Sequence, residues 1–155
     1  MPRKSLGSST SGTSISWIYS PSERSTRMDR TVRGHALNRA AVAITGEKHL
    51  LTNPVTLESA VMSPRNLFHY ENEDDIGVLG CRLIVALSRA HAFIQGNKRT
   101  AWLSGIMFLN INGYDVILPS AEANTFIAEQ ITKVIQRDVS ESDFFRNLDT
   151  FIVPL

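Results

Sequence analysis

Apolar residues recur at helical spacing along most of the chain. One such pattern runs from Arg30 to Ile44 and stops before Gly46, and another covers residues 55–62. Residues three and four positions apart share one face of an α-helix, so this spacing predicts helices that bury one side. Ser63-Pro64 resembles a cap followed by proline in a first turn, and we expect a new helix to start there.

The segments 76–90 and 100–111 are too rich in apolar residues for helices with one wet face, and we expect both to be buried central helices. Asn112-Gly113 supplies a stop for the second of them. Residues 114–118 have the composition of a short extended segment. Ser120 and Ser140 then precede two more amphipathic patterns, the last of which reaches residue 151. Because strand signals are otherwise nearly absent, the sequence predicts an all-α fold, a compact helical bundle.

The positive charge of the chain is concentrated near its N-terminus. Residues 1–33 carry six Lys or Arg against two acidic residues, while the remainder carries ten against thirteen. Residues 1–28 are also rich in Ser, Thr and Gly, with too few apolar groups to offset the entropy of ordering them. We therefore expect a flexible basic tail over 1–28 and one domain over 29–155, with neither nucleic acid nor a membrane as a direct partner.

Cysteine usage and hydropathy indicate the compartment. Cys81 is the only cysteine, so an internal disulfide cannot form, and its place in an apolar helical pattern predicts a buried structural thiol. No apolar run approaches the roughly 18 residues that a membrane-spanning helix needs. These features predict a cytoplasmic protein.

Candidate chemistry lies in the loop between the two central helices, where residues 91–99 read His-Ala-Phe-Ile-Gln-Gly-Asn-Lys-Arg. Unpaired backbone N–H groups at a helix start favour an anion, and Lys98 and Arg99 add full positive charge. Gly96 lets the backbone approach a ligand closely. A histidine at such a site can accept a proton from a hydroxyl near neutral pH. We expect Phe93 and Ile94 to anchor the loop in the core.

Residues 91–101 closely resemble the Fic/Doc signature, His-x-Phe-x-Asp/Glu-Gly/Ala-Asn-Gly/Lys-Arg. The similarity extends upstream to residues 57–68 and downstream to residues 108–114, and covers roughly residues 40–150. Lys98 stands where AMP-transferring Fic proteins usually have glycine, and Trp102 replaces a second arginine of those enzymes. Both features resemble the death-on-curing (Doc) branch.

The resemblance implies a function and roles for the loop residues. His91 would be the general base, and Gly96, Asn97, Lys98 and Arg99 would bind the phosphates of ATP. The chain would then be the toxin of a toxin–antitoxin module and would phosphorylate a Ser or Thr hydroxyl of a translation factor, elongation factor Tu in the Doc branch. Many Fic proteins carry an inhibitory Ser/Thr-x-x-x-Glu-Gly/Asn helix, which this sequence lacks. The resemblance therefore implies a cognate antitoxin that acts in trans.

Gln95 departs from the family pattern, which has a carboxylate at this position to hold magnesium. A glutamine keeps a carbonyl oxygen but loses the charge that a hard cation prefers, so Mg²⁺ binding is expected to weaken. Three functions remain open at this point: a Doc-like kinase, a Fic-type AMP or nucleotidyl transferase, and a non-catalytic protein that binds a nucleotide or a partner.

Overall fold

The computed structural model describes Ile15 and residues 49–155. Within these residues the chain forms five helices and one pair of strands, in the order α2 (Pro54–Glu71), α3 (Ile76–Ala90), α4 (Asn97–Ile111), β1 (Tyr114–Val116), α5 (Ala121–Gln136), α6 (Glu141–Asp149) and β2 (Ile152–Pro154). The predicted all-α class is confirmed. Apart from Ile15, the predicted tail over 1–28, the domain start at residue 29 and the helix over 30–44 lie outside the described residues.

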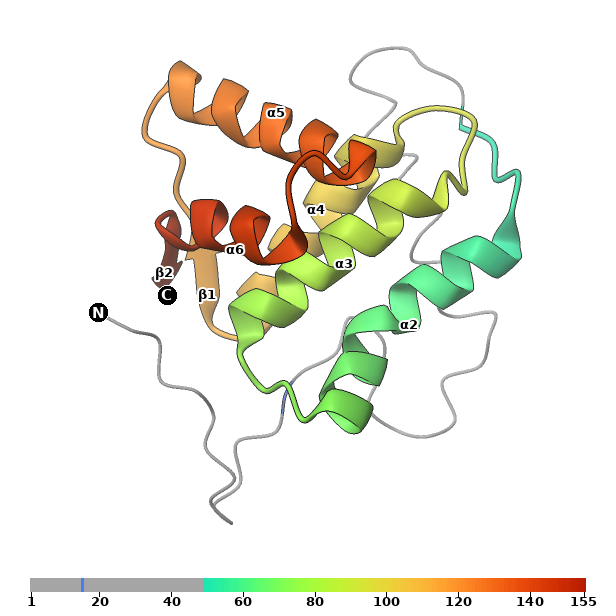
Figure 1. The fold of residues 1–155 in the computed structure, drawn as a ribbon, viewed down its shortest axis with the longest axis horizontal. Helices are drawn as coiled ribbons and strands as arrows, with labels where there is room; N and C mark the ends of the chain where they lie inside the picture. The colour runs from blue at the N-terminus through green and yellow to red at the C-terminus, as the bar shows by residue number, and fades with distance from the viewer. Residues whose placement is uncertain (1–14, 16–48) are drawn as a thin grey trace.

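Helix α3 occupies the centre of the fold and has the bounds that its apolar pattern predicts. It packs against α2 on one side, against α5 and α6 on another, and against α4 behind it (Figure 1). This arrangement explains why apolar residues surround its axis. Its fully buried side chains include Leu79 and Ile84, and Cys81 is buried as expected. Among the helices formed by residues 49–155, none combines the length and the apolar content that crossing a membrane requires.

Helix α4 is less buried than the sequence predicts. One face packs into the core through Ala101, Phe108 and Leu109, but Leu103 is 37% exposed and Trp102 is half-buried. These two residues border a pocket between α4 and α5, described below. The expectation of a helix buried on all sides was wrong because the apolar residues on this side line an open pocket.

Helices α3 and α4 approach each other closely at two glycines. A Cβ atom at Gly80 of α3 would meet the side chain of Leu109 of α4, and one at Gly105 of α4 would overlap the side chain of Ile84 of α3. The two glycines thus lie at the contact between the helices that flank the loop 91–96.

Gly105→Ala is expected to lower the free energy of unfolding by up to about 2 kcal/mol in total, because the added methyl group overpacks the contact with Ile84 at a cost of about 1–3 kcal/mol. Alanine would otherwise stabilise a helix interior by roughly 1 kcal/mol. Urea unfolding followed by circular dichroism measures the change. Gly80→Ala is the matched control, since its nearest neighbour is a terminal methyl group of Leu109 that can move, and a smaller loss is expected.

Helix α2 is continuous, which corrects the helix break expected at Ser63-Pro64. It begins after Asn53, whose side chain caps the backbone N–H of Thr56, and it runs through Pro64 to Glu71. A proline inside a helix removes one hydrogen bond and costs about 3 kcal/mol. The uninterrupted helix buries five residues together, which offsets that cost: Leu57, Ala60, Val61, Pro64 and Leu67.

The C-terminal end also differs from the prediction. Helix α6 ends at Asp149, and after a turn at 150–151 the chain forms β2, which pairs antiparallel with β1 in the register Tyr114↔Pro154 and Val116↔Ile152. The extended segment expected after Gly113 is therefore confirmed, whereas the helix expected to reach residue 151 is too long. Strand β2 was missed because the helical spacing of Phe144, Leu148 and Phe151 continues past the end of α6.

The helix starts expected at Ser120 and Ser140 are confirmed, and both serines are N-caps. Ser120 accepts a hydrogen bond from the backbone N–H of Ala123 at the start of α5, and Ser140 accepts one from Asp143 at the start of α6. The pKa of the exposed Glu122 carboxyl lies below its ordinary value, because the carboxylate accepts hydrogen bonds from its own backbone N–H and from Ser120. Both helix starts therefore have their orphan N–H groups partly satisfied.

Candidate functional site

The loop between α3 and α4, together with the first turn of α4, carries all the site residues that the sequence predicts. His91 follows the last residue of α3 in the left-handed conformation, with φ 45° and ψ 42°, and its side chain is exposed. Gly96, with φ 74°, precedes α4, and Lys98 and Arg99 lie in the first turn of that helix. The structure thus places a histidine at one end of the loop and two exposed cations at the other.

Asn97 holds the loop together through its side-chain amide. Its Oδ1 accepts a hydrogen bond from the backbone N–H of Phe93 at 3.0 Å, and its Nδ2 donates to the carbonyl of Phe93 at 2.7 Å. Both ends of the amide are therefore engaged within the protein. The phosphate contact that the sequence predicts for Asn97 would come from its backbone N–H, which lies in the first turn of α4.

The segment before α2 supports the loop from the other side. The backbone N–H groups of Thr52 and Asn53 donate to the carbonyl of Ala92 at 2.8 and 3.1 Å, and the hydroxyl of Thr52 donates to the same oxygen at 3.0 Å. The N–H of Ile94 donates to the carbonyl of Leu50 at 2.9 Å. Sequence reasoning missed these supports, because an irregular segment before a helix has no periodicity.

Only one of the two predicted loop anchors is buried. Phe93 is 3% exposed and joins the core, whereas Ile94 is 51% exposed. Phe93 forms an isolated antiparallel bridge with Leu51, and side chains alternate in direction along such extended backbone. The inward position of Phe93 therefore turns Ile94 outward, which corrects the expectation for Ile94.

Asn97→Asp is expected to lower the free energy of unfolding by about 1–3 kcal/mol, because it removes the donor to the carbonyl of Phe93 and sets a carboxylate against that oxygen. Thermal or urea unfolding measures this loss. Asn124→Asp makes the same chemical change at an exposed amide of α5 and should shift stability by less than about 0.5 kcal/mol. Equal effects at the two positions would contradict the structural role given to Asn97.

The start of α4 has the features of an anion site. Backbone N–H groups of a first helical turn lack intrahelical acceptors, and the helix dipole adds partial positive charge there. Gly96 precedes the helix and supplies no side-chain cap. The Lys98 ammonium lies across toward α5, where it donates a hydrogen bond to the Thr132 hydroxyl at 3.1 Å. The exposed Arg99 follows it.

A pocket of about 300 Å³ adjoins this anion site, between α4 and α5. Its volume lies at the lower end of the range typical of small-molecule sites. Its lining is mainly apolar, with cationic side chains and one amide: Lys98, Arg99, Trp102, Leu103, Leu118, Asn124, Ile127, Ala128 and Ile131. Sequence reasoning missed the part contributed by α5, because its apolar positions have the same spacing as ordinary core residues.

The loop does not fit a magnesium site built by the protein. Gln95 is exposed and offers a neutral carbonyl oxygen. Across residues 49–155, no group of three or more His, Cys, Asp or Glu side chains comes together in a way that would hold a metal ion. Mg²⁺ usually takes one or two carboxylates in addition to phosphate oxygens and water. The loop therefore supplies anion-binding groups without the charged oxygens that a cation prefers.

Comparison with known proteins supports the similarity to the Fic/Doc signature that residues 91–101 show. A model described as the Fic/DOC family matches residues 22–109, more than half of the chain. The Toxin Doc of Mycolicibacterium smegmatis is 55% identical over 31 residues, which is 20% of this chain and 24% of that protein. The matched segment therefore spans about a quarter of this relative's length.

Proposed function

We propose that this chain, which belongs to the Fic/DOC family, is a Doc-like toxin that transfers phosphate from ATP to a Ser or Thr hydroxyl of a protein. The observation that carries the proposal is the arrangement of the loop. His91 and the cationic start of α4 flank a loop whose backbone is fixed by Asn97 and Thr52. Such a loop can hold a proton acceptor in a set position relative to bound phosphates.

In this proposal His91 acts as the general base. Its exposed imidazole accepts the proton of the attacking hydroxyl, while the hydroxyl oxygen forms a bond to the terminal phosphorus. The bond between that phosphorus and the bridging oxygen breaks, which leaves a phosphorylated side chain and a nucleoside diphosphate. Phosphate transfer depends mainly on positioning and on stabilising the charge of the phosphate oxygens.

The start of α4 would bind the phosphates of the donor. Lys98, Arg99 and the backbone N–H groups of the first turn surround the anion, with Gly96 permitting a close approach. The apolar pocket between α4 and α5 has room for part of a nucleoside, and the same two cations border it. One ligand with an apolar ring and an anionic tail fits both features, which supports ATP as the donor.

Magnesium would come with the nucleotide, because the loop supplies no carboxylate for it. Magnesium bound to a nucleotide would neutralise part of the negative charge on its phosphates. The neutral Gln95 makes the protein's own contribution to that charge balance depend on Lys98 and Arg99. We therefore expect phosphate transfer to depend on both Lys98 and Arg99.

The partners follow from the resemblance to Doc. The acceptor would be a translation factor, with elongation factor Tu as the first candidate, and a cognate antitoxin would restrain the toxin in trans. The partial match to a protein named Toxin Doc supports this pairing with an antitoxin. A neighbouring gene that relieves the toxicity of the expressed chain would support the proposed module.

The test is transfer of label from ATP to purified elongation factor Tu in the presence of magnesium. Label from γ-³²P-ATP is expected on the protein, and label from α-³²P-ATP is not. Transfer of the α label would instead identify a nucleotidyl transferase. Absence of transfer from any labelled nucleoside triphosphate to this factor or to a cell extract would refute the proposed enzymatic function.

A further inference from the structure

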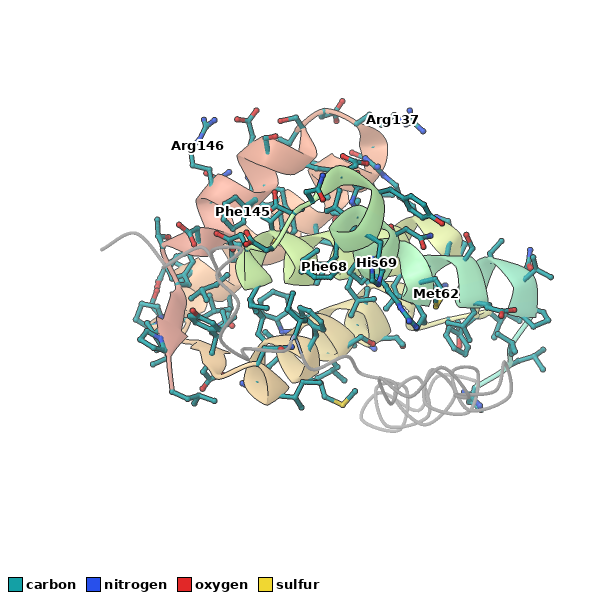
Figure 2. The ribbon with its side chains drawn as sticks, turned by 90° about the horizontal axis from the view of Figure 1, so that it is seen from below. Met62, Phe68, His69, Arg137, Phe145 and Arg146 are labelled. Carbon is teal, nitrogen blue, oxygen red and sulfur yellow. The ribbon has the colours of Figure 1, made fainter. Side chains whose placement is uncertain are left out.

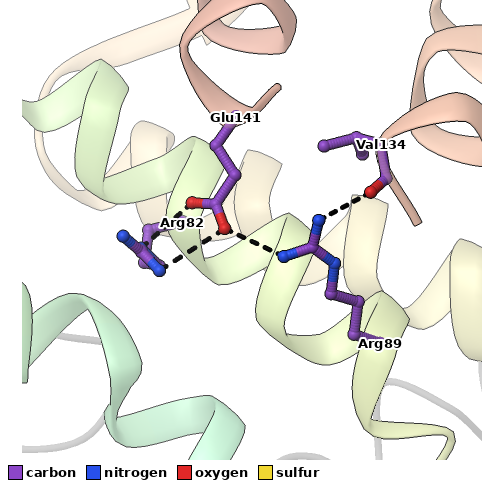
Figure 3. A network of polar contacts seen from close by, with 4 residues as sticks. All are labelled: Arg82, Arg89, Val134 and Glu141. Carbon is purple, nitrogen blue, oxygen red and sulfur yellow. Dashed lines mark hydrogen bonds and ion pairs between the residues drawn. The ribbon is translucent and has the colours of Figure 1, made fainter. Parts of the chain in front are cut away.

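A cluster of charged side chains joins α3 to the last two helices. Glu141 is the first residue of α6, and its carboxylate lies between two arginines of α3. Its Oε1 is 3.0 Å from Nη1 of Arg89, and its Oε2 is 3.3 Å from Nε of Arg82 (Figure 3). The two arginines are seven residues apart, or about two helical turns, and so lie on one face of α3. All three side chains are only about a third exposed.

Arg89 makes a second contact that Arg82 does not share among the described interactions. Its Nη2 donates a hydrogen bond of 2.7 Å to the carbonyl of Val134, in the last turn of α5 (Figure 3). Carbonyls at a helix C-terminus carry partial negative charge, and the start of a helix favours the carboxylate of Glu141. One planar guanidinium therefore joins the end of α5 to the start of α6.

Arg89 also lies two residues before His91, in the last turn of α3. The end of α3 sets the position of the His91 backbone, from which the exposed imidazole extends. The other half of the site depends on α5 as well, because Lys98 donates to Thr132 and α5 lines the pocket. Arg89 thus ties the histidine end of α3 to the helix that contacts the phosphate-binding end.

We propose that Arg89, held by Glu141 and the carbonyl of Val134, is a positioning residue that sets the place of His91 relative to the start of α4. It does not touch the reacting atoms. This inference rests on the proposed function, in which His91 is the general base. Arg82 shares the same carboxylate but lies nine residues before His91, about two and a half helical turns, so it offers a matched control within the same cluster.

The test compares Arg89→Ala with Arg82→Ala in the full chain. Misplacement of a catalytic group by about 1 Å can cost about 100-fold in rate, so Arg89→Ala is expected to lower kcat by about 10- to 100-fold. Its KM for ATP should stay within about threefold. Arg82→Ala should keep kcat within about twofold. Arg146, which pairs with Asp143 on the surface of α6, points into solvent (Figure 2), and Arg146→Ala should change neither quantity.

A second measurement separates this inference from the proposed function. The ¹H–¹³C NMR signal of the His91 imidazole is expected to shift in Arg89→Ala and to stay in place in Arg82→Ala. If the wild-type chain transfers no phosphate, the proposed function fails, while the NMR comparison still tests the positioning role. Equal loss of kcat in the two variants, or an unmoved His91 signal in Arg89→Ala, would overturn the inference. If Arg89→Ala does not fold, Arg89→Lys takes its place. Lysine keeps the charge but lacks the planar guanidinium that contacts both Glu141 and Val134, so kcat should fall and the His91 signal should shift in this variant too.

Discussion

His91→Ala is expected to reduce phosphate transfer by about 10²–10⁴-fold, the usual contribution of general acid–base catalysis. Alanine removes the proposed acceptor of the hydroxyl proton and leaves the proposed phosphate-binding start of α4 intact. The affinity for ATP should therefore change by less than about threefold. Single-turnover transfer from γ-³²P-ATP measures the chemical step, and fluorescence or calorimetric titration measures nucleotide binding.

Stability should hardly change in this variant. His91 is exposed, and its left-handed backbone conformation is no easier for alanine, so a small loss of stability is the most that the structure predicts. His69 supplies a matched control, since it is an exposed histidine in the last turn of α2 (Figure 2). It lies about 24 Å along that helix from the end that supports the loop. His69→Ala should keep full activity, and an equal loss in both variants would contradict the role of His91.

The central part of the fold could be predicted because its sequence signals are local. The apolar content of 76–90 gave a helix with the observed bounds, and Ser120 and Ser140 marked the starts of α5 and α6. Capping residues and helical spacing act over one or two turns, so they are visible in a short window of sequence. The predicted loop between two helices follows directly from these elements.

The features that escaped prediction depend on partners distant in sequence. The helix break expected at Pro64 failed because burial against α3 keeps the helix intact. Strand β2 exists through its pairing with β1, which lies nearly 40 residues earlier. The pocket wall on α5 and the pairing of Glu141 with Arg89 likewise require the folded arrangement. The motif located the candidate site, but the contacts that support its loop come from other segments.

Gln95→Asp is expected to lower the magnesium concentration required for half-maximal transfer by about tenfold and to raise the rate. A carboxylate in this loop would add the charged oxygen that a hard cation prefers, and charge count is a main determinant of affinity at such sites. Transfer from γ-³²P-ATP, measured across a magnesium titration, gives both quantities. Gln95→Asn is the matched control, because it has the same shape as aspartate without the charge.

The position of Gln95 makes this comparison informative. The residue is exposed and immediately precedes Gly96, so a change of charge there should leave the core and the Asn97–Phe93 hydrogen bonds in place. A gain in Gln95→Asp but not in Gln95→Asn would show that the missing charge alone limits transfer. No gain in magnesium affinity or in transfer would mean that the loop lacks more than an acid. That result would favour a protein that uses its cationic loop to bind a nucleotide or a partner without catalysing transfer.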